Sequence, residues 1–143
     1  MPRSWVVGLI VFCIVLNGSG FAWNIFEPIP LYDEIAHLIT PLTLVAITAE
    51  IIYRSGGDDE FFNTPRRAII TGSVIGLVGA AGWEGIEVLL DMMGFPISRA
   101  LPDTTFDIFL GVVGGAIGAW AADCFLDRLF KRSRTSANRP RVR

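Results

Sequence analysis

Long apolar segments alternate with short polar ones along the whole chain. Four mainly apolar segments occupy residues 4–26, 31–53, 68–90 and 106–130. A helix that crosses the roughly 30 Å hydrocarbon core of a bilayer needs about 20 such residues, because each residue adds about 1.5 Å. Each segment therefore predicts one transmembrane helix.

Composition leaves little of the chain for anything but these helices. Hydrophobic residues make up 52% of the 143 residues, and the mean hydropathy is +0.52. The connecting segments are short and rich in proline, glycine and charge, which favours hydrated turns. The sequence predicts an all-α, four-helix integral membrane bundle over residues 1–130, followed by a basic, disordered tail at 131–143.

The basic residues indicate an orientation. Every Lys and Arg except Arg99 lies before the first helix, in the 54–67 loop, or from Arg128 onwards. Because cytoplasmic segments carry the excess of basic residues, we expect both termini to be cytoplasmic and the 27–32 and 91–105 loops to face outward. The chain is then a multi-pass protein of the inner (cytoplasmic) membrane, with membrane lipids and no nucleic acid as its partners.

The first segment permits a second interpretation. Arg3, the apolar run at 5–16 and the small residues around Gly20 and Ala22 also resemble a signal peptide with a cleavage site. The apolar stretch continues to Phe26, a length that favours a full span. Cleavage would leave the predicted orientation of the other three helices unchanged.

Three pairs of ionisable residues occur at helical spacing near the predicted outer end of the bundle. They are Asp33 and His37, Glu84 and Glu87, and Asp103 and Asp107. An Asp at the centre of a span costs about 2.5 to 3.5 kcal/mol on insertion scales, so ionisable residues within spans usually mark a functional site. Antiparallel neighbouring helices would present the pairs at one level. We expect them to converge in a single outward-facing pocket.

The cluster predicts either a bound cation or shared protons, because closely packed carboxylates without compensation would be forced to protonate. The candidate catalytic residues are His37, Glu84 and Glu87. The candidate ligands of a divalent metal ion are Asp33, His37, Glu84, Glu87, Asp103 and Asp107, with Asp33 and Asp103 as outer or additional ligands. A single histidine argues against a di-iron centre with two Glu-x-x-His motifs, but leaves Mg²⁺, Mn²⁺, Ca²⁺, Zn²⁺ and Fe²⁺ open.

Each of these charges also has a structural explanation. Asp33 and Asp103 can cap their helices, and the spacing from Thr104 to Asp107 fits a capping box. A lone histidine such as His37 is often a hydrogen-bonded structural residue and not a ligand. The same charges would then satisfy one another and hold the helices in register.

Glycines indicate where the helices pack. The third helix carries Gly72 and Gly76 one turn apart, and the fourth carries Gly111, Gly114, Gly115 and Gly118. Small residues at this spacing let membrane helices approach closely. They predict that the third and fourth helices make the tightest contact, with Asp107 on the glycine face. The same glycines would also suit a homo-oligomer.

The ionisable motifs resemble those of known families. The second helix opens with Asp33-x-x-x-His37, residues 83–87 are Trp-Glu-Gly-Ile-Glu, and residues 103–107 are Asp-Thr-Thr-Phe-Asp. Over residues 30–120, this combination resembles the small four-helix VanZ-like membrane proteins and, more closely, the related YjdF-like inner-membrane family. VanZ-like proteins are associated with resistance to glycopeptides, especially teicoplanin. The resemblance therefore implies a role in the cell envelope.

Three classes of function follow. The preferred class is a membrane protein whose outward-facing carboxylate and histidine site, with or without a metal ion, acts on a lipid or envelope substrate. The second is a non-enzymatic membrane scaffold or binding protein. An ion or proton transporter fits less well, because residues 38–49, 68–82 and 108–122 contain no ionisable side chain that would continue a path across the span.

Overall fold

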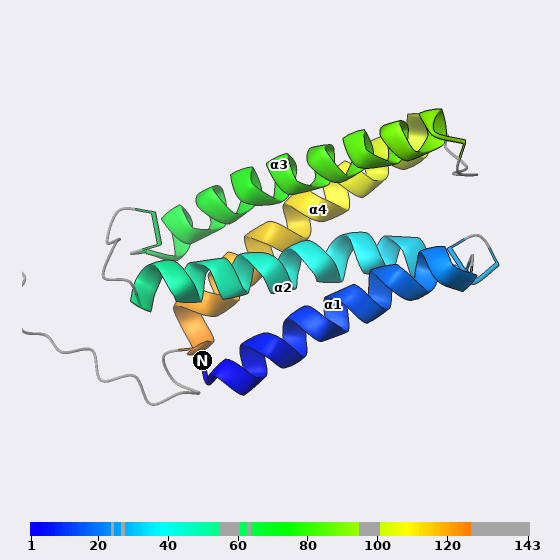
Figure 1. Ribbon diagram of the computed structural model, residues 1–143. Coiled ribbons are helices and arrows are strands. Elements are labelled where there is room, and N and C mark those ends of the chain that lie inside the picture. Colours follow the sequence, from blue (N-terminus) through cyan, green and yellow to red (C-terminus); the bar gives the residue numbers. More distant parts are fainter. Residues whose placement is uncertain (24, 27, 55–60, 63, 95–100, 127–143) are drawn as a thin grey trace, which may run out of the picture.

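The computed structural model describes residues 1–23, 25–26, 28–54, 61–62, 64–94 and 101–126, which form an all-helical bundle (Figure 1). The helices are α1 (Arg3–Trp23), α2 (Tyr32–Arg54), α3 (Pro65–Met92) and α4 (Leu101–Ala121), and α4 continues into the π-helical turn η1 (Ala122–Leu126). By length and composition, all four α-helices can cross a membrane.

Local sequence explains where α3 and α4 begin. The Arg67 N–H donates to the Thr64 hydroxyl at 3.3 Å, and Pro65 occupies the start of α3, where its missing N–H costs nothing. α4 begins at Leu101, before the expected position 106, and Pro102 is compatible with this start because it lies in the first turn of the helix. This earlier start places the acidic pair of α4 further inside the helix.

α4 is the central helix of the bundle. It packs along both α2 and α3, and it lies behind them in Figure 1. Among the described residues, the backbone of α1 approaches only that of α2. The N-terminus and η1 lie at one end of the bundle, while α2 starts and α3 ends at the other. The cytoplasmic assignment of both termini stays a prediction, and the 131–143 tail lies outside the described residues.

Hydrogen bonds join α1 to α2. The Asn17 side chain donates to the Thr40 hydroxyl at 2.8 Å, and the Tyr32 hydroxyl donates to the Leu16 carbonyl at 2.7 Å. The hydroxyls of Ser19 and Tyr32 are also 2.7 Å apart. Polar contacts of this kind help membrane helices to associate, since lipid provides no hydrophobic force between them.

The α3–α4 contact is the most extensive between any two helices, as the glycine pattern predicts. Gly76 faces the backbone of Gly111, and Gly72 faces the backbone of Gly115. A β-carbon at Gly72, Gly76 or Gly115 would overlap backbone atoms of the facing helix. The two helices can therefore approach this closely only because these side chains are absent.

The other two glycines of α4 face α2. Gly114 lies against the backbone at Leu38, and Gly118 lies against the backbone at Leu42. The prediction that all four glycines of α4 face α3 is therefore wrong for these two. They are rotated by about 60° around the helix from the other pair, because a residue advances about 100° per position. α4 thus presents two adjacent glycine faces, one to each neighbour.

Candidate functional site

His37 occupies the centre of the candidate site. It lies one turn after Asp33 near the start of α2, and its Nε2 is 3.4 Å from Asp33 Oδ1, an ion pair when the imidazole is protonated. His37 is only 8% exposed. Asp33 lies in the first turn of α2, where the helix dipole favours a carboxylate. The start of α2 therefore presents an acid and an imidazole on one face.

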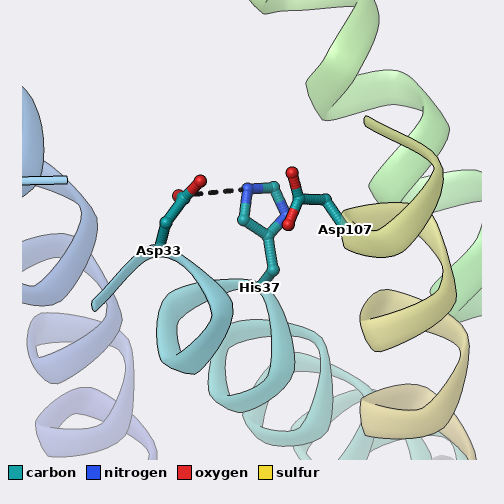
Figure 2. Close-up of side chains that lie close together, drawn as sticks. All are labelled: Asp33, His37 and Asp107. Atoms are coloured by element: carbon teal, nitrogen blue, oxygen red, sulfur yellow. Dashed lines mark ion pairs between the residues drawn. The ribbon is translucent and has the colours of Figure 1, made fainter. Parts of the chain in front are cut away.

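Asp107 approaches the imidazole from α4, on the side away from Asp33 (Figure 2). One potential ligand atom from each of Asp33, His37 and Asp107 lies within 4.8 Å of the other two. Asp107 is only 4% exposed. Its position follows from the close approach of Gly114 to Leu38, two turns along α4 and one residue beyond His37. These three side chains can therefore contact a single metal ion.

Glu84 brings α3 into the site. It is 7% exposed, and its charge interacts with those of His37 and Asp107. Glu84 Oε1 and Asp107 Oδ1 are both buried, and neither has a hydrogen-bond partner within the described part of the chain. Leaving such oxygens unpaired in a low-dielectric interior is costly. Coordination to a cation would satisfy both.

Glu87 lies at the edge of the cluster. It is partly buried, and it accepts a hydrogen bond from Trp83 Nε1 at 2.9 Å. Its charge interacts with those of Glu84 and His37. Asp103 is exposed at the start of α4 and does not belong to the three-residue group. Of the predicted ligands, Asp103 is therefore the one that the structure leaves at the surface.

Residues from α2, α3 and α4 thus meet at the end of the bundle where α2 begins. Asp91, further along α3, is exposed and apart from them. Arg99, the basic residue of the predicted outer loops, lies outside the described residues. The role of each clustered residue as a ligand or a catalytic group stays a prediction.

A family model matches residues 1–128, which include all four helices and the whole candidate site. The chain belongs to the family described as "Predicted membrane protein (DUF2238)". This membership agrees with the four helices that can cross a membrane, and it identifies a multi-pass membrane protein. It gives no support specific to the VanZ-like or YjdF-like resemblance. No curated protein and no solved structure matches the chain.

This DUF2238 member also has a groove that its sequence does not predict. Its volume is about 490 Å³, and it runs between α1 and α3 with α2 as its floor. The residues that line it are Ile10, Cys13, Ile14 and Asn17 of α1, Ala36, His37, Thr40, Pro41, Leu44, Val45 and Thr48 of α2, and Ile75, Gly76, Gly79, Ala80 and Trp83 of α3. The one signal in the sequence was the amide of Asn17 within an otherwise apolar span.

Proposed function

We propose that the protein binds a divalent cation at its intramembrane cluster and acts on a lipid or cell-envelope substrate in the inner membrane. The observation that carries this proposal is the pair of buried, unpartnered oxygens, Glu84 Oε1 and Asp107 Oδ1. Asp107 belongs to a group of acid and imidazole side chains spaced closely enough to share an ion, and the charge of Glu84 interacts with that group. The orientation proposed from the basic residues places this site towards the outer face of the membrane.

The donor set fits a cation that accepts oxygen ligands. Asp33, His37 and Asp107 would hold the ion, and Glu84 would add a further carboxylate from α3. One imidazole among carboxylates suits Mg²⁺, Mn²⁺, Ca²⁺, or mononuclear Zn²⁺ or Fe²⁺. Such an ion would act as a Lewis acid on a carbonyl or phosphoryl oxygen. In this scheme His37, Glu84 and Glu87 are the candidate catalytic residues, and the Trp83 N–H orients Glu87.

A non-enzymatic scaffold or binding protein, including a VanZ-like envelope role, is the second candidate. Two contacts favour it: the Asp33–His37 pair and the hydrogen bond from Trp83 to Glu87. Both contacts lie within one helix, the first in α2 and the second in α3, so part of the cluster satisfies itself without a metal ion. The scaffold requires no metal ion, so metal content separates it from the first proposal.

Element analysis of purified protein provides that test. We expect close to one divalent ion per chain in the wild type, and a metal affinity lower by about tenfold or more in Asp107→Asn and Glu84→Gln, which remove carboxylates of the proposed site. Asp91→Asn is the matched control, because Asp91 is an exposed acid on the same helix as Glu84. Folded wild-type protein without metal, after incubation with each candidate ion, would favour the scaffold.

A second test concerns orientation. Single cysteines introduced at Ser98 and Ser133, in a variant with Cys13 and Cys124 replaced by alanine, report the two predicted sides of the membrane. An impermeant thiol reagent applied to intact cells should label position 98 and not position 133, because the basic tail is retained in the cytoplasm. Labelling of position 133 alone would reverse the orientation and place the site at the cytoplasmic face.

A further inference from the structure

The groove between α1 and α3 is open to its surroundings along the bundle. Ile14 on one wall is 64% exposed, and Leu44 on the floor is 44% exposed. Both residues lie in helices that can cross a membrane, so the surroundings are lipid hydrocarbon. The groove is therefore a lateral opening from the bilayer into the bundle.

Near the candidate site, aromatic side chains bridge the two walls of the groove. The rings of Phe21 from α1 and Trp83 from α3 have centroids 5.8 Å apart, although the two backbones do not approach each other within the described residues. His37 and Trp83 line this end of the groove. An apolar channel thus leads from the bilayer to the imidazole of the acid–histidine cluster.

The geometry points to a phospholipid as the occupant, with one aliphatic chain in the groove and its phosphate at His37. This inference deepens the proposed function, and it rests on that function for the cation that would bind the phosphate. The lining is almost entirely apolar, with few polar groups besides those at the His37 end and the hydrogen-bonded pair of Asn17 and Thr40. Pockets for small molecules are typically apolar cavities of roughly 300 to 1,000 Å³ with a few such polar groups.

The length of the groove suits one chain of one leaflet. From His37 to Thr48 the floor follows α2 for about 16 Å, at about 1.5 Å per residue. That length is about half of the roughly 30 Å hydrocarbon thickness. An aliphatic chain that starts at His37 therefore reaches the far end of the groove within the span of a single leaflet.

A helix from a second copy of the protein is the other occupant to consider. A helix is about 10 Å wide, whereas a flexible chain of methylene groups requires much less width. The groove also ends at polar side chains, among them His37, which a phosphate-bearing lipid can match and an apolar helix cannot.

The charges at the His37 end of the groove determine which polar group can bind there. Asp33, Asp107 and Glu84 surround His37, so an anionic phosphate is repelled unless a cation lies between them. Carboxylate-held Mg²⁺ in proteins commonly completes its coordination with substrate phosphates. The proposed cation would thus hold the phosphate, while the groove holds the chain.

Photo-crosslinking tests the chain site directly. The probe is phosphatidylglycerol with a diazirine midway along one acyl chain, in vesicles containing the purified protein. We expect crosslinks to concentrate on Leu44 and Thr48 of the groove floor. Gly79→Leu should lower this yield at least tenfold, because Gly79 lines the groove and a β-carbon there meets no atom within 4 Å, so the added side chain fills the groove without disturbing the fold.

Gly82→Leu is the matched control. Gly82 lies on the same helix, also has open space around its β-carbon position, and does not line the groove. Its crosslinking yield should equal that of the wild type. Ile14→Trp, on the opposite wall, provides a second block. The inference would be overturned if all three variants gave equal yields of lipid crosslinks to Leu44 and Thr48. Crosslinks between two copies of the protein through the groove would also overturn it.

The same comparison with a metal chelator separates the two proposals. If crosslinks to the groove floor persist with the chelator and become fewer in Gly79→Leu, the groove binds an acyl chain even if the protein binds no metal. A yield that Gly79→Leu leaves unchanged overturns the chain site even if element analysis finds one ion per chain. Each proposal can therefore fail alone.

Discussion

Gly114→Ala and Gly76→Ala are each expected to lower the stability of the protein by more than any conservative change on its lipid-facing surface. The added β-carbon at Gly114 would overlap the carbonyl of Leu38, and the one at Gly76 would overlap the carbonyl of Gly111. Overpacking typically costs about 1–3 kcal/mol, and we expect the upper part of that range or more, because backbone atoms cannot move aside as side chains do. Thermal unfolding in detergent measures the loss.

Gly82→Ala is the control for both variants, since its β-carbon would meet no atom within 4 Å. We expect it to match or slightly exceed the wild type in stability, as alanine is the better helix former. If the cluster binds a divalent ion as proposed, Gly114→Ala should also weaken that binding, because it pushes Asp107 away from His37. Equal unfolding temperatures for Gly114→Ala and Gly82→Ala would contradict the α2–α4 contact described here.

The second large effect is that a bound metal ion should reverse the order of stability of the wild type and Asp107→Asn. Without metal, Asp107→Asn should be more stable than the wild type, because it replaces a buried carboxylate, repelled by the charges of Asp33 and Glu84, with an uncharged side chain of similar size. Burying an uncompensated polar group costs about 1–3 kcal/mol, and more when the group is charged. With a divalent ion at 100 times its dissociation constant, the wild type should gain about 2.7 kcal/mol and the variant much less. The order of the two unfolding temperatures should then be inverted.

Unfolding of both proteins with a chelator and with saturating metal checks this reversal. Asp91→Asn is again the control, because Asp91 is exposed. Its unfolding temperature should equal that of the wild type both with a chelator and with metal. If the wild type and Asp107→Asn respond equally to every divalent ion, the cluster does not bind metal, and the scaffold interpretation gains support.

The sequence predicted the number of helices because run length is a strong signal in a membrane protein. It could not assign glycines to partners: the 3.6-residue period shows that Gly111 and Gly114 lie on neighbouring faces, but not which helix covers each. That His37 and Asp107 lie at the same depth in the bundle could be predicted, because each lies a similar number of residues after the start of its helix. The exposure of Asp103 could not be predicted, because periodicity alone does not show which positions of a helix its neighbours cover.

The groove could not be predicted for a related reason. Its residues are ordinary apolar side chains, and nothing in their periodicity distinguishes a face that packs from one that remains uncovered. The groove arises because the backbone of α1 approaches α2 and not α3, which is a property of the whole bundle.

The limited attachment of α1 has a consequence for how the protein is assembled. Its links to the rest include the Asn17–Thr40 and Tyr32–Leu16 hydrogen bonds, and interhelical bonds in membranes are worth only about 0.6 to 2 kcal/mol each. α2, α3 and α4 share far more extensive contacts. We therefore expect α1 to dock last, onto α2, α3 and α4 already packed together, and its docking would complete one wall of the lateral entrance to the bundle.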